Sequence, residues 1–238
     1  MTPTPLAQTG NTFQSAARIQ QSLLAPLERR CLYWLAARMP LRINSDHLTL
    51  LGLVAMFLAG ATYALARRWP PALLAVGGWL ALNWFGDSLD GTLARVRNCQ
   101  RPRYGFYVDH MVDTFGALFM LAGLGFSGYM AGSVAIALLL AFYLLSINTY
   151  LATYTLGTFQ LSFWKFSPTE LRILLATGNV AAFVRPTVHV WGQSYRFFDV
   201  AGTIGMVCMA VVLAAGVTQN TRELYAREKP AQEPREKL

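Results

Sequence analysis

The feature that most constrains the fold is a run of 51 residues, 114–164, that contains no charged side chain. A bilayer core needs about 20 consecutive apolar residues per helix, so this run predicts two membrane spans. A small, glycine-rich stretch at 127–133 marks the break between them. Two uncharged stretches precede the run and two apolar ones follow it, at 49–66, 69–86, 171–184 and 200–217. The sequence therefore predicts six transmembrane helices.

Composition and charge agree with this interpretation. Hydrophobic residues make up 54% of the chain and charged residues 13%, a balance typical of an integral membrane protein. If both termini are cytoplasmic, sixteen of the 20 Lys and Arg residues lie on that side. The four on the other side are Arg67, Arg68, Arg185 and Arg196. The positive-inside rule therefore predicts that both termini, and the loop after the second span, are cytoplasmic. The expected location is the inner or plasma membrane of a bacterium, with the active site on the cytoplasmic side.

The net charge of +8 is explained by this topology, so it requires no nucleic-acid partner. Basic flanks of this kind attract anionic lipid headgroups, which makes membrane lipids the expected surroundings of the protein.

Three segments are expected along the chain: an N-terminal cytoplasmic segment at 1–40, a six-helix catalytic domain at 41–217 and a cytoplasmic tail at 218–238. Residues 26–40, PLERRCLYWLAARMP, predict an amphipathic helix with one face formed by Leu27, Cys31, Trp34 and Leu35. This helix either lies in the membrane interface or packs against the spans. The expected fold is thus an all-α integral membrane protein with an interfacial amphipathic helix.

Four aspartates lie close together in the sequence: Asp87, Asp90, Asp109 and Asp113. The first pair is spaced i, i+3 at the end of the second span, and the other pair i, i+4 at the start of the third, so each pair shares a helical face. Because these spans are antiparallel neighbours, the four carboxylates can converge at one membrane edge.

Such a cluster cannot stay ionised alone, since each intramembrane charge costs roughly 2.5–3.5 kcal/mol and like charges repel. Oxygen-only ligands select hard divalent ions, and four carboxylates suit a pair of ions that clamps a phosphoryl group. Two alternatives stay open: a proton relay, or pairing with the arginines of the adjoining loop, Arg95, Arg97, Arg101 and Arg103.

Small residues and an arginine surround the aspartates. Gly91 directly follows Asp90, where a backbone can approach a ligand closely. Ala94 precedes Arg95, whose planar guanidinium suits phosphate. Gly105 lies four residues before Asp109. Together these residues predict a slot for a nucleotide diphosphate.

This pattern resembles the signature of the CDP-alcohol phosphotransferase family, D-x2-D-G-x2-A-R followed by G-x3-D-x3-D. All eight fixed positions are matched, from Asp87 to Asp113, and the resemblance covers about residues 40–217. The spacer before Gly105 is nine residues, where the family usually has eight. Upstream, INSDHLTLLG resembles the family's first-span motif I-x-P-N-x-x-T-x-x-G. It keeps Thr49 and Gly52 but has Ser45 and Asp46 where Pro and Asn are usual.

The resemblance implies an enzyme of phospholipid biosynthesis. The hydroxyl of an acceptor alcohol would attack a CDP-alcohol, such as CDP-diacylglycerol or a CDP-aminoalcohol, and release CMP. By position, the four aspartates would hold two Mg²⁺ or Mn²⁺ ions, and Asp113 would also be the general base. The nucleotide site would take in Gly91, Ala94, Arg95, Gly105 and Thr49. Homodimers are common in this family, although no motif here indicates one.

His110 lies inside D-H-x-x-D, as in the choline and ethanolamine phosphotransferase branch. It would either share the base role of Asp113 or be an interfacial histidine without one. Two other classes of protein remain open: a polytopic transporter with a carboxylate ion site, and a metal-dependent membrane phosphatase with water as acceptor.

Other polar and aromatic residues have two interpretations each. Lys165 and Arg172 bind an acceptor phosphate or lipid headgroup, or the segment only begins a helix with Glu170 in its first turn. Pairing of Glu170 and Arg172 across helices is a further alternative. Asn83 and Asn148 are expected to form helix-to-helix hydrogen bonds. The residues expected at the membrane interfaces are Tyr104, Tyr107, His189 and Trp191.

Overall fold

The computed structural model describes residues 17–19, 25–160 and 168–228. Each of the six predicted spans forms one helix, and a seventh precedes them. The helices are α1 (Ala25–Arg38), α2 (Ser45–Ala66), α3 (Ala72–Val96), α4 (Pro102–Phe126), α5 (Gly132–Leu156), α6 (Pro168–Val184) and α7 (Phe197–Arg227). The break between α4 and α5 falls in the predicted glycine-rich stretch, and α7 continues beyond 217 to Arg227.

Two small sheets were not predicted from the sequence. β1 (Ala17–Ile19) pairs in parallel with β2 (Thr158–Gln160), which follows α5. β3 (Thr187–Val190) and β4 (Gln193–Arg196) form an antiparallel hairpin between α6 and α7. Its turn has positive φ at Trp191 and Gly192, 49° and 81°. A bulky residue is uncommon in this turn geometry, so the usual hairpin signal is absent from the sequence.

Three of the helices, α2, α5 and α7, are long and apolar enough to cross a membrane. They fit an α-helical membrane protein. This set does not include α3 and α4, which carry the aspartates, or the 17-residue α6.

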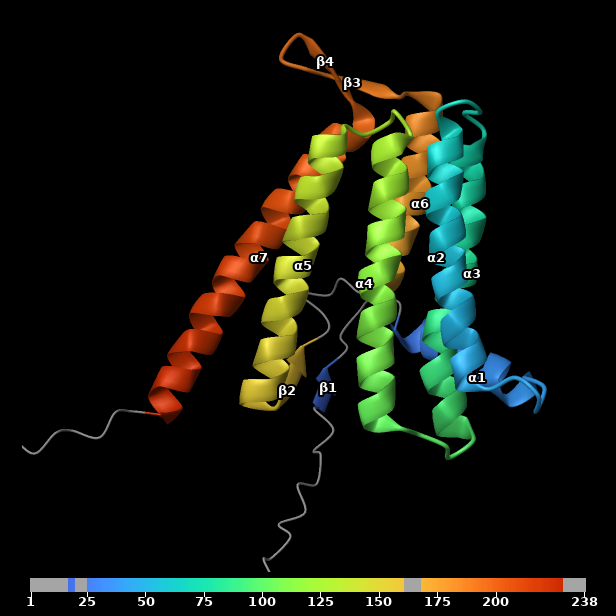
Figure 1. Ribbon diagram of the computed structural model, residues 1–238, viewed down its shortest axis with the longest axis vertical. Helices are drawn as coiled ribbons and strands as arrows, with labels where there is room; N and C mark the ends of the chain where they lie inside the picture. The colour runs from blue at the N-terminus through green and yellow to red at the C-terminus, as the bar shows by residue number, and fades with distance from the viewer. Residues whose placement is uncertain (1–16, 20–24, 161–167, 229–238) are drawn as a thin grey trace, which may run out of the picture.

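The helices form two groups, visible in Figure 1. α2, α3, α4 and α6 stand side by side, and α5 packs along α7, which leans away from the rest toward its C-terminal end. The groups join around buried Tyr63 of α2, which donates a hydrogen bond to Asn179 of α6 (2.8 Å) and contacts the ring of Phe198 of α7 edge-on. This core lies at the hairpin end, away from the end where α3 meets α4.

Glycines bring α2 and α4 into backbone contact. A Cβ at Gly123 would lie far inside van der Waals distance of the Gly60 carbonyl, and a Cβ at Gly60 would meet the Phe119 carbonyl. Small residues that let helix backbones approach in this way are the usual basis of packing in membranes.

We therefore expect Gly123→Ala to lower the free energy of unfolding by about 1–3 kcal/mol or more, because the backbone of Gly60 cannot move aside cheaply. Gly78→Ala is the matched control, since a Cβ there meets nothing within 4 Å and alanine is the better helix former. Thermal unfolding in detergent checks both. Equal melting temperatures for the two variants would contradict the close α2–α4 contact.

α1 packs beside the aspartate-bearing part of α3. Leu32 and Ala36 are buried and belong to one cluster with Leu89 and Leu93 of α3. Of the predicted apolar face, Leu35 is partly buried against this cluster, whereas Leu27 is 69% and Trp34 55% exposed. The helix therefore packs mainly through the neighbouring face of Leu32 and Ala36 and leaves most of its predicted face exposed.

Candidate active site

The four aspartates come from the facing ends of α3 and α4. Asp90 interacts electrostatically with Asp87 and Asp109, and Asp113 interacts with all three of the others. Asp90 is buried, Asp87 and Asp109 are half-buried and Asp113 is exposed. The antiparallel pairing of α3 and α4 thus brings together the carboxylates that the motif spacing singled out.

The donor set fits a hard divalent ion, because the cluster offers carboxylate oxygens from two helices. Among the described residues, no three His, Cys, Asp or Glu side chains already have the arrangement of a metal site.

Asp90 is held from α2. Thr49 donates its hydroxyl hydrogen to Asp90 Oδ2 (2.6 Å), and Ser45 donates to the Asp90 backbone oxygen (2.6 Å). α2 reaches this point because it packs tightly on α3, where a Cβ at Gly86 would collide with the backbone of Leu48 and Gly52. Thr49, which the resemblance assigned to the nucleotide site, therefore contacts a predicted metal ligand.

Arg172 of α6 also enters the cluster. Its Nη2 lies 2.6 Å from Asp87 Oδ2, and its Nε donates to Asn83 Oδ1 (2.8 Å). The side chain is only 14% exposed, and its charge also attracts Asp113. Asn83 in turn donates to the Gly52 carbonyl (3.0 Å), which confirms its predicted helix-to-helix bond. No sequence pattern indicated that Arg172 pairs with Asp87, 85 residues away.

The predicted nucleotide residues lie around the α3–α4 turn. Arg95 is exposed, donates from Nη2 to Thr92 Oγ1 (2.9 Å) and has Nη1 3.6 Å from where a Gly91 Cβ would be. Ala94 is partly exposed, and a Cβ at Gly105 would meet nothing within 4 Å. The backbone here is thus accessible to a ligand.

The chain departs from the family pattern in its longer spacer and in its first-span motif, and these two segments contact each other. Arg101, in the longer spacer, forms an ion pair with Asp46, which stands where Asn is usual. The hydrogen bond that Arg101 donates to the Asp46 carboxylate raises the pKa of Arg101 above its ordinary value. Both side chains are well exposed, and exposed pairs contribute only about 0–1 kcal/mol. The pair therefore ties the loop to the start of α2 without adding much stability.

His110 has a defined ring orientation. Its Nδ1 is hydrogen-bonded to the Phe106 carbonyl, and because a carbonyl only accepts, Nδ1 carries the proton. In the neutral ring the lone pair is then on Nε2. Tyr150 of α5 contacts the imidazole edge-on, with ring centroids 4.7 Å apart, and interacts with Asp113. Sequence reasoning missed Tyr150, because nothing in α5 distinguished it from other aromatic residues.

The remaining predicted residues lie elsewhere. Lys165 falls outside the described residues. Asn148 of α5 lies next to Gly216 of α7, and Thr169 and Glu170 are in the first turn of α6. Tyr104 and Tyr107 are exposed, with the Arg101 guanidinium 4.1 Å from the Tyr104 ring. His189 is hydrogen-bonded to Ser194, and Trp191 is fully exposed at the hairpin turn.

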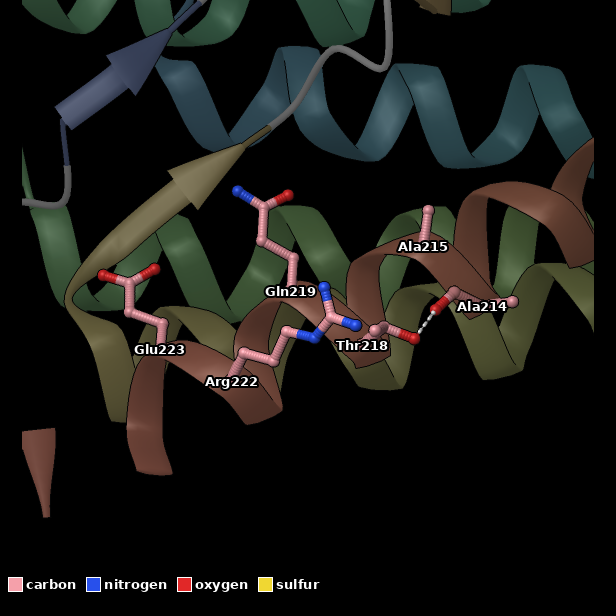
Figure 2. Close-up of a pocket in the computed structure, with 6 residues that line it drawn as sticks. All are labelled: Ala214, Ala215, Thr218, Gln219, Arg222 and Glu223. Atoms are coloured by element: carbon pink, nitrogen blue, oxygen red, sulfur yellow. Dashed lines mark hydrogen bonds between the residues drawn. The ribbon is translucent and has the colours of Figure 1, made fainter. Parts of the chain in front are cut away.

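A shallow cavity of about 670 Å³ lies along the last turns of α7, and Figure 2 shows its lining. The lining residues are Ala214, Ala215, Thr218, Gln219, Arg222 and Glu223. All of them belong to α7, and none is among the residues predicted to be functional.

These helices and their acidic ends define a class: a helical membrane fold with a carboxylate cluster between its second and third predicted spans. No protein-family model matches the chain, and the search of curated proteins gave no match. Among solved structures, the chain is similar to phosphatidylinositol phosphate synthase PgsA1 of Mycobacterium tuberculosis with CDP-DAG bound. The TM-score is 0.52 at 19% identity, over 88% of this chain and 98% of that one. The chain thus has the fold of a CDP-alcohol phosphotransferase, as the motif predicted.

Proposed function

We propose that this protein is a membrane CDP-alcohol phosphotransferase of phospholipid biosynthesis. It transfers the substituted phosphate of a CDP-alcohol to the hydroxyl of an acceptor alcohol and releases CMP. The observation that carries the proposal is that Asp87, Asp90, Asp109 and Asp113 interact in a chain with this fold. The likeness in fold does not rest on overall sequence similarity, since the identity is 19%.

The proposed topology has six spans, α2 to α7, inside a catalytic domain at 41–217. The α3–α4 turn and both termini lie in the cytoplasm, as the distribution of basic residues predicts. α1 lies in the cytoplasmic interface with Leu27 and Trp34 toward lipid, since both are exposed and its other face is packed.

In the proposed reaction the acceptor oxygen attacks the phosphorus that carries the alcohol, and the bond from that phosphorus to the bridging oxygen breaks. Asp113 takes the acceptor's proton, or His110 takes it through Nε2. Arg95 and the backbone at Gly91 and Gly105 bind the nucleotide diphosphate. The four aspartates would hold Mg²⁺ or Mn²⁺, which supplies neutralisation of the phosphates and of the leaving CMP.

For the donor, the CDP-DAG bound to the structural neighbour favours CDP-diacylglycerol with a polar acceptor. Arg172 then lies at the carboxylates, where its guanidinium would orient an anionic acceptor. The second direction, a CDP-aminoalcohol with diacylglycerol, is favoured by His110 within D-H-x-x-D. The two directions use the same site and differ in which substrate carries the lipid.

The test is CMP release by purified protein in mixed micelles, with and without a second alcohol. Both donor classes are offered with a wide panel of acceptors, and EDTA is followed by Mg²⁺ or Mn²⁺. The proposal expects release that needs both the acceptor and the ion. Release without any acceptor alcohol would identify a phosphatase. No release with the whole panel would reject the proposal and favour a transporter.

Thr49→Val is expected to lower kcat/KM by about 5- to 50-fold, because it leaves Asp90 without its hydroxyl donor at nearly constant volume. Residues that orient a metal ligand typically contribute about 10- to 100-fold to metal affinity or to activity. Thr177→Val is the control, since Thr177 only donates to carbonyls of its own helix. An unchanged KM for the ion and an unchanged kcat in Thr49→Val would contradict this role.

A further inference from the structure

Glu28 of α1 joins three helices through one oxygen. Its Oε1 accepts hydrogen bonds from Trp84 Nε1 (2.8 Å) and Thr169 Oγ1 (2.7 Å), and more weakly from Ser88 Oγ (3.4 Å). Trp84 and Ser88 belong to α3 and Thr169 to the first turn of α6. The carboxylate therefore connects α1, α3 and α6 at one point.

The residues that bind Glu28 are close in sequence to residues of the carboxylate cluster. Trp84 precedes Asp87 by three residues and Ser88 follows it, so the α3 donors flank the turn that presents Asp87. Thr169 precedes Arg172 by three residues, which places the two in adjacent turns of one face of α6. Arg172 binds Asp87 and Asn83. The same two helices are thus joined twice, by Glu28 and by Arg172.

We propose that Glu28 is a positioning residue, which holds the start of α6 against α3 so that the Arg172 guanidinium stays at Asp87. The inference rests on the proposed function, because it treats Asp87 and Arg172 as parts of the active site. All three donors to Glu28 are neutral groups. An amide oxygen can accept from them as a carboxylate does, so Gln should replace Glu28 whereas Ala should not.

The first test does not depend on any activity. Hydrogen–deuterium exchange of the full-length protein in detergent follows the amides of residues 169–175. Glu28→Ala is expected to raise their exchange rates about 10-fold or more, as local opening becomes easier, and Glu28→Gln should leave them near wild type. Glu223→Ala is the control, because Glu223 is an exposed glutamate paired with Arg227 on α7. Unchanged exchange in Glu28→Ala, or equal changes in both Glu28 variants, would overturn the proposal.

The second test asks whether Glu28 acts through Arg172. Glu28→Ala is expected to lower kcat/KM for the acceptor about 10-fold or more, as small misplacements do, and Glu28→Gln to restore it. In an Arg172→Gln background, Glu28→Ala should cost less than about 2-fold, because coupled residues are not additive. Additive losses would overturn the link.

Thr169→Val removes the α6 donor at nearly constant volume, so it tests the contact even if Glu28→Ala folds poorly. It should reproduce the faster exchange of residues 169–175, and a wild-type exchange pattern would overturn the proposal. If no variant releases CMP but the exchange results hold, the proposed function fails and the α1–α3–α6 contact stands.

Discussion

Asp109→Asn is expected to abolish metal-dependent CMP release, with a loss of at least about 100-fold in kcat/KM. Asp109 interacts with Asp90 of the other pair as well as with Asp113 of its own, so it belongs to the cluster formed by both pairs. An amide keeps the shape of the side chain but removes the charge that a divalent ion needs. A catalytic ion contributes several kcal/mol to a phosphoryl transfer, and each 1.36 kcal/mol is a factor of ten in rate.

Two measurements separate loss of the ion from loss of the fold. Equilibrium binding of Mn²⁺, followed by its electron paramagnetic resonance signal, should weaken in Asp109→Asn, while the melting temperature without metal stays near wild type. Asp199→Asn is the matched control. Asp199 accepts a hydrogen bond from the Ala131 amide at the hairpin end, and an Asn oxygen can still accept it. Full Mn²⁺ binding and turnover in Asp109→Asn would refute the assignment of Asp109 as a ligand.

The positions of the helices could be predicted from the sequence because long uncharged runs have few alternatives in a membrane. A bilayer leaves the backbone only a helix or a closed barrel to satisfy its hydrogen bonds. The glycine-rich stretch at 127–133 therefore located the end of α4 correctly. The β3–β4 hairpin could not be predicted, because Trp191 occupies a turn position where the sequence rule expects Asn, Asp or Gly.

The candidate site likewise has a part that could be predicted from the sequence and a part that could not. The four aspartates were found together because helical spacing and an antiparallel neighbour are local properties. The contacts that hold them were missed, because periodicity does not determine which helix of a bundle faces which. Thr49 reaches Asp90 and Arg172 reaches Asp87 only through the packing of α2 and α6 on α3. Likewise, the polar face of α1 gave no reason to join Glu28 to Thr169, 141 residues away.

The face by which α1 packs shows a further limit of pattern reasoning. Leu27 and Trp34 form the obvious apolar face, yet Leu32 and Ala36 are the residues buried against α3. In water the larger apolar side chains would be buried first. Next to a membrane, lipid can cover them instead, and the smaller face is left for close helix packing. Large apolar side chains are thus expected inside a protein in water, whereas at a membrane they can remain on the surface that faces lipid.

Asp113→Asn is expected to lower kcat by about 100- to 10,000-fold, the usual contribution of a general base, while binding of CDP falls only a few-fold. Asp113 is the exposed member of the cluster, so an acceptor hydroxyl can reach it. The buried Asp90 and the paired Asp87 remain in place for the divalent ion that would bind the nucleotide phosphates. Single-turnover CMP release measures the chemical step, and equilibrium binding of labelled CDP measures the nucleotide site.

His110→Gln decides between the two candidate bases. If Asp113 takes the proton, the Gln variant should keep kcat within about tenfold of wild type, because the imidazole then takes no part in proton transfer and serves only its structural contacts, including those with Phe106 and Tyr150. If His110 takes the proton through Nε2, its loss should match the 100-fold or greater effect of a missing base. A wild-type chemical step in Asp113→Asn together with a full loss in His110→Gln would transfer the base role to His110. Wild-type turnover in both variants would exclude both side chains as the group that accepts the proton.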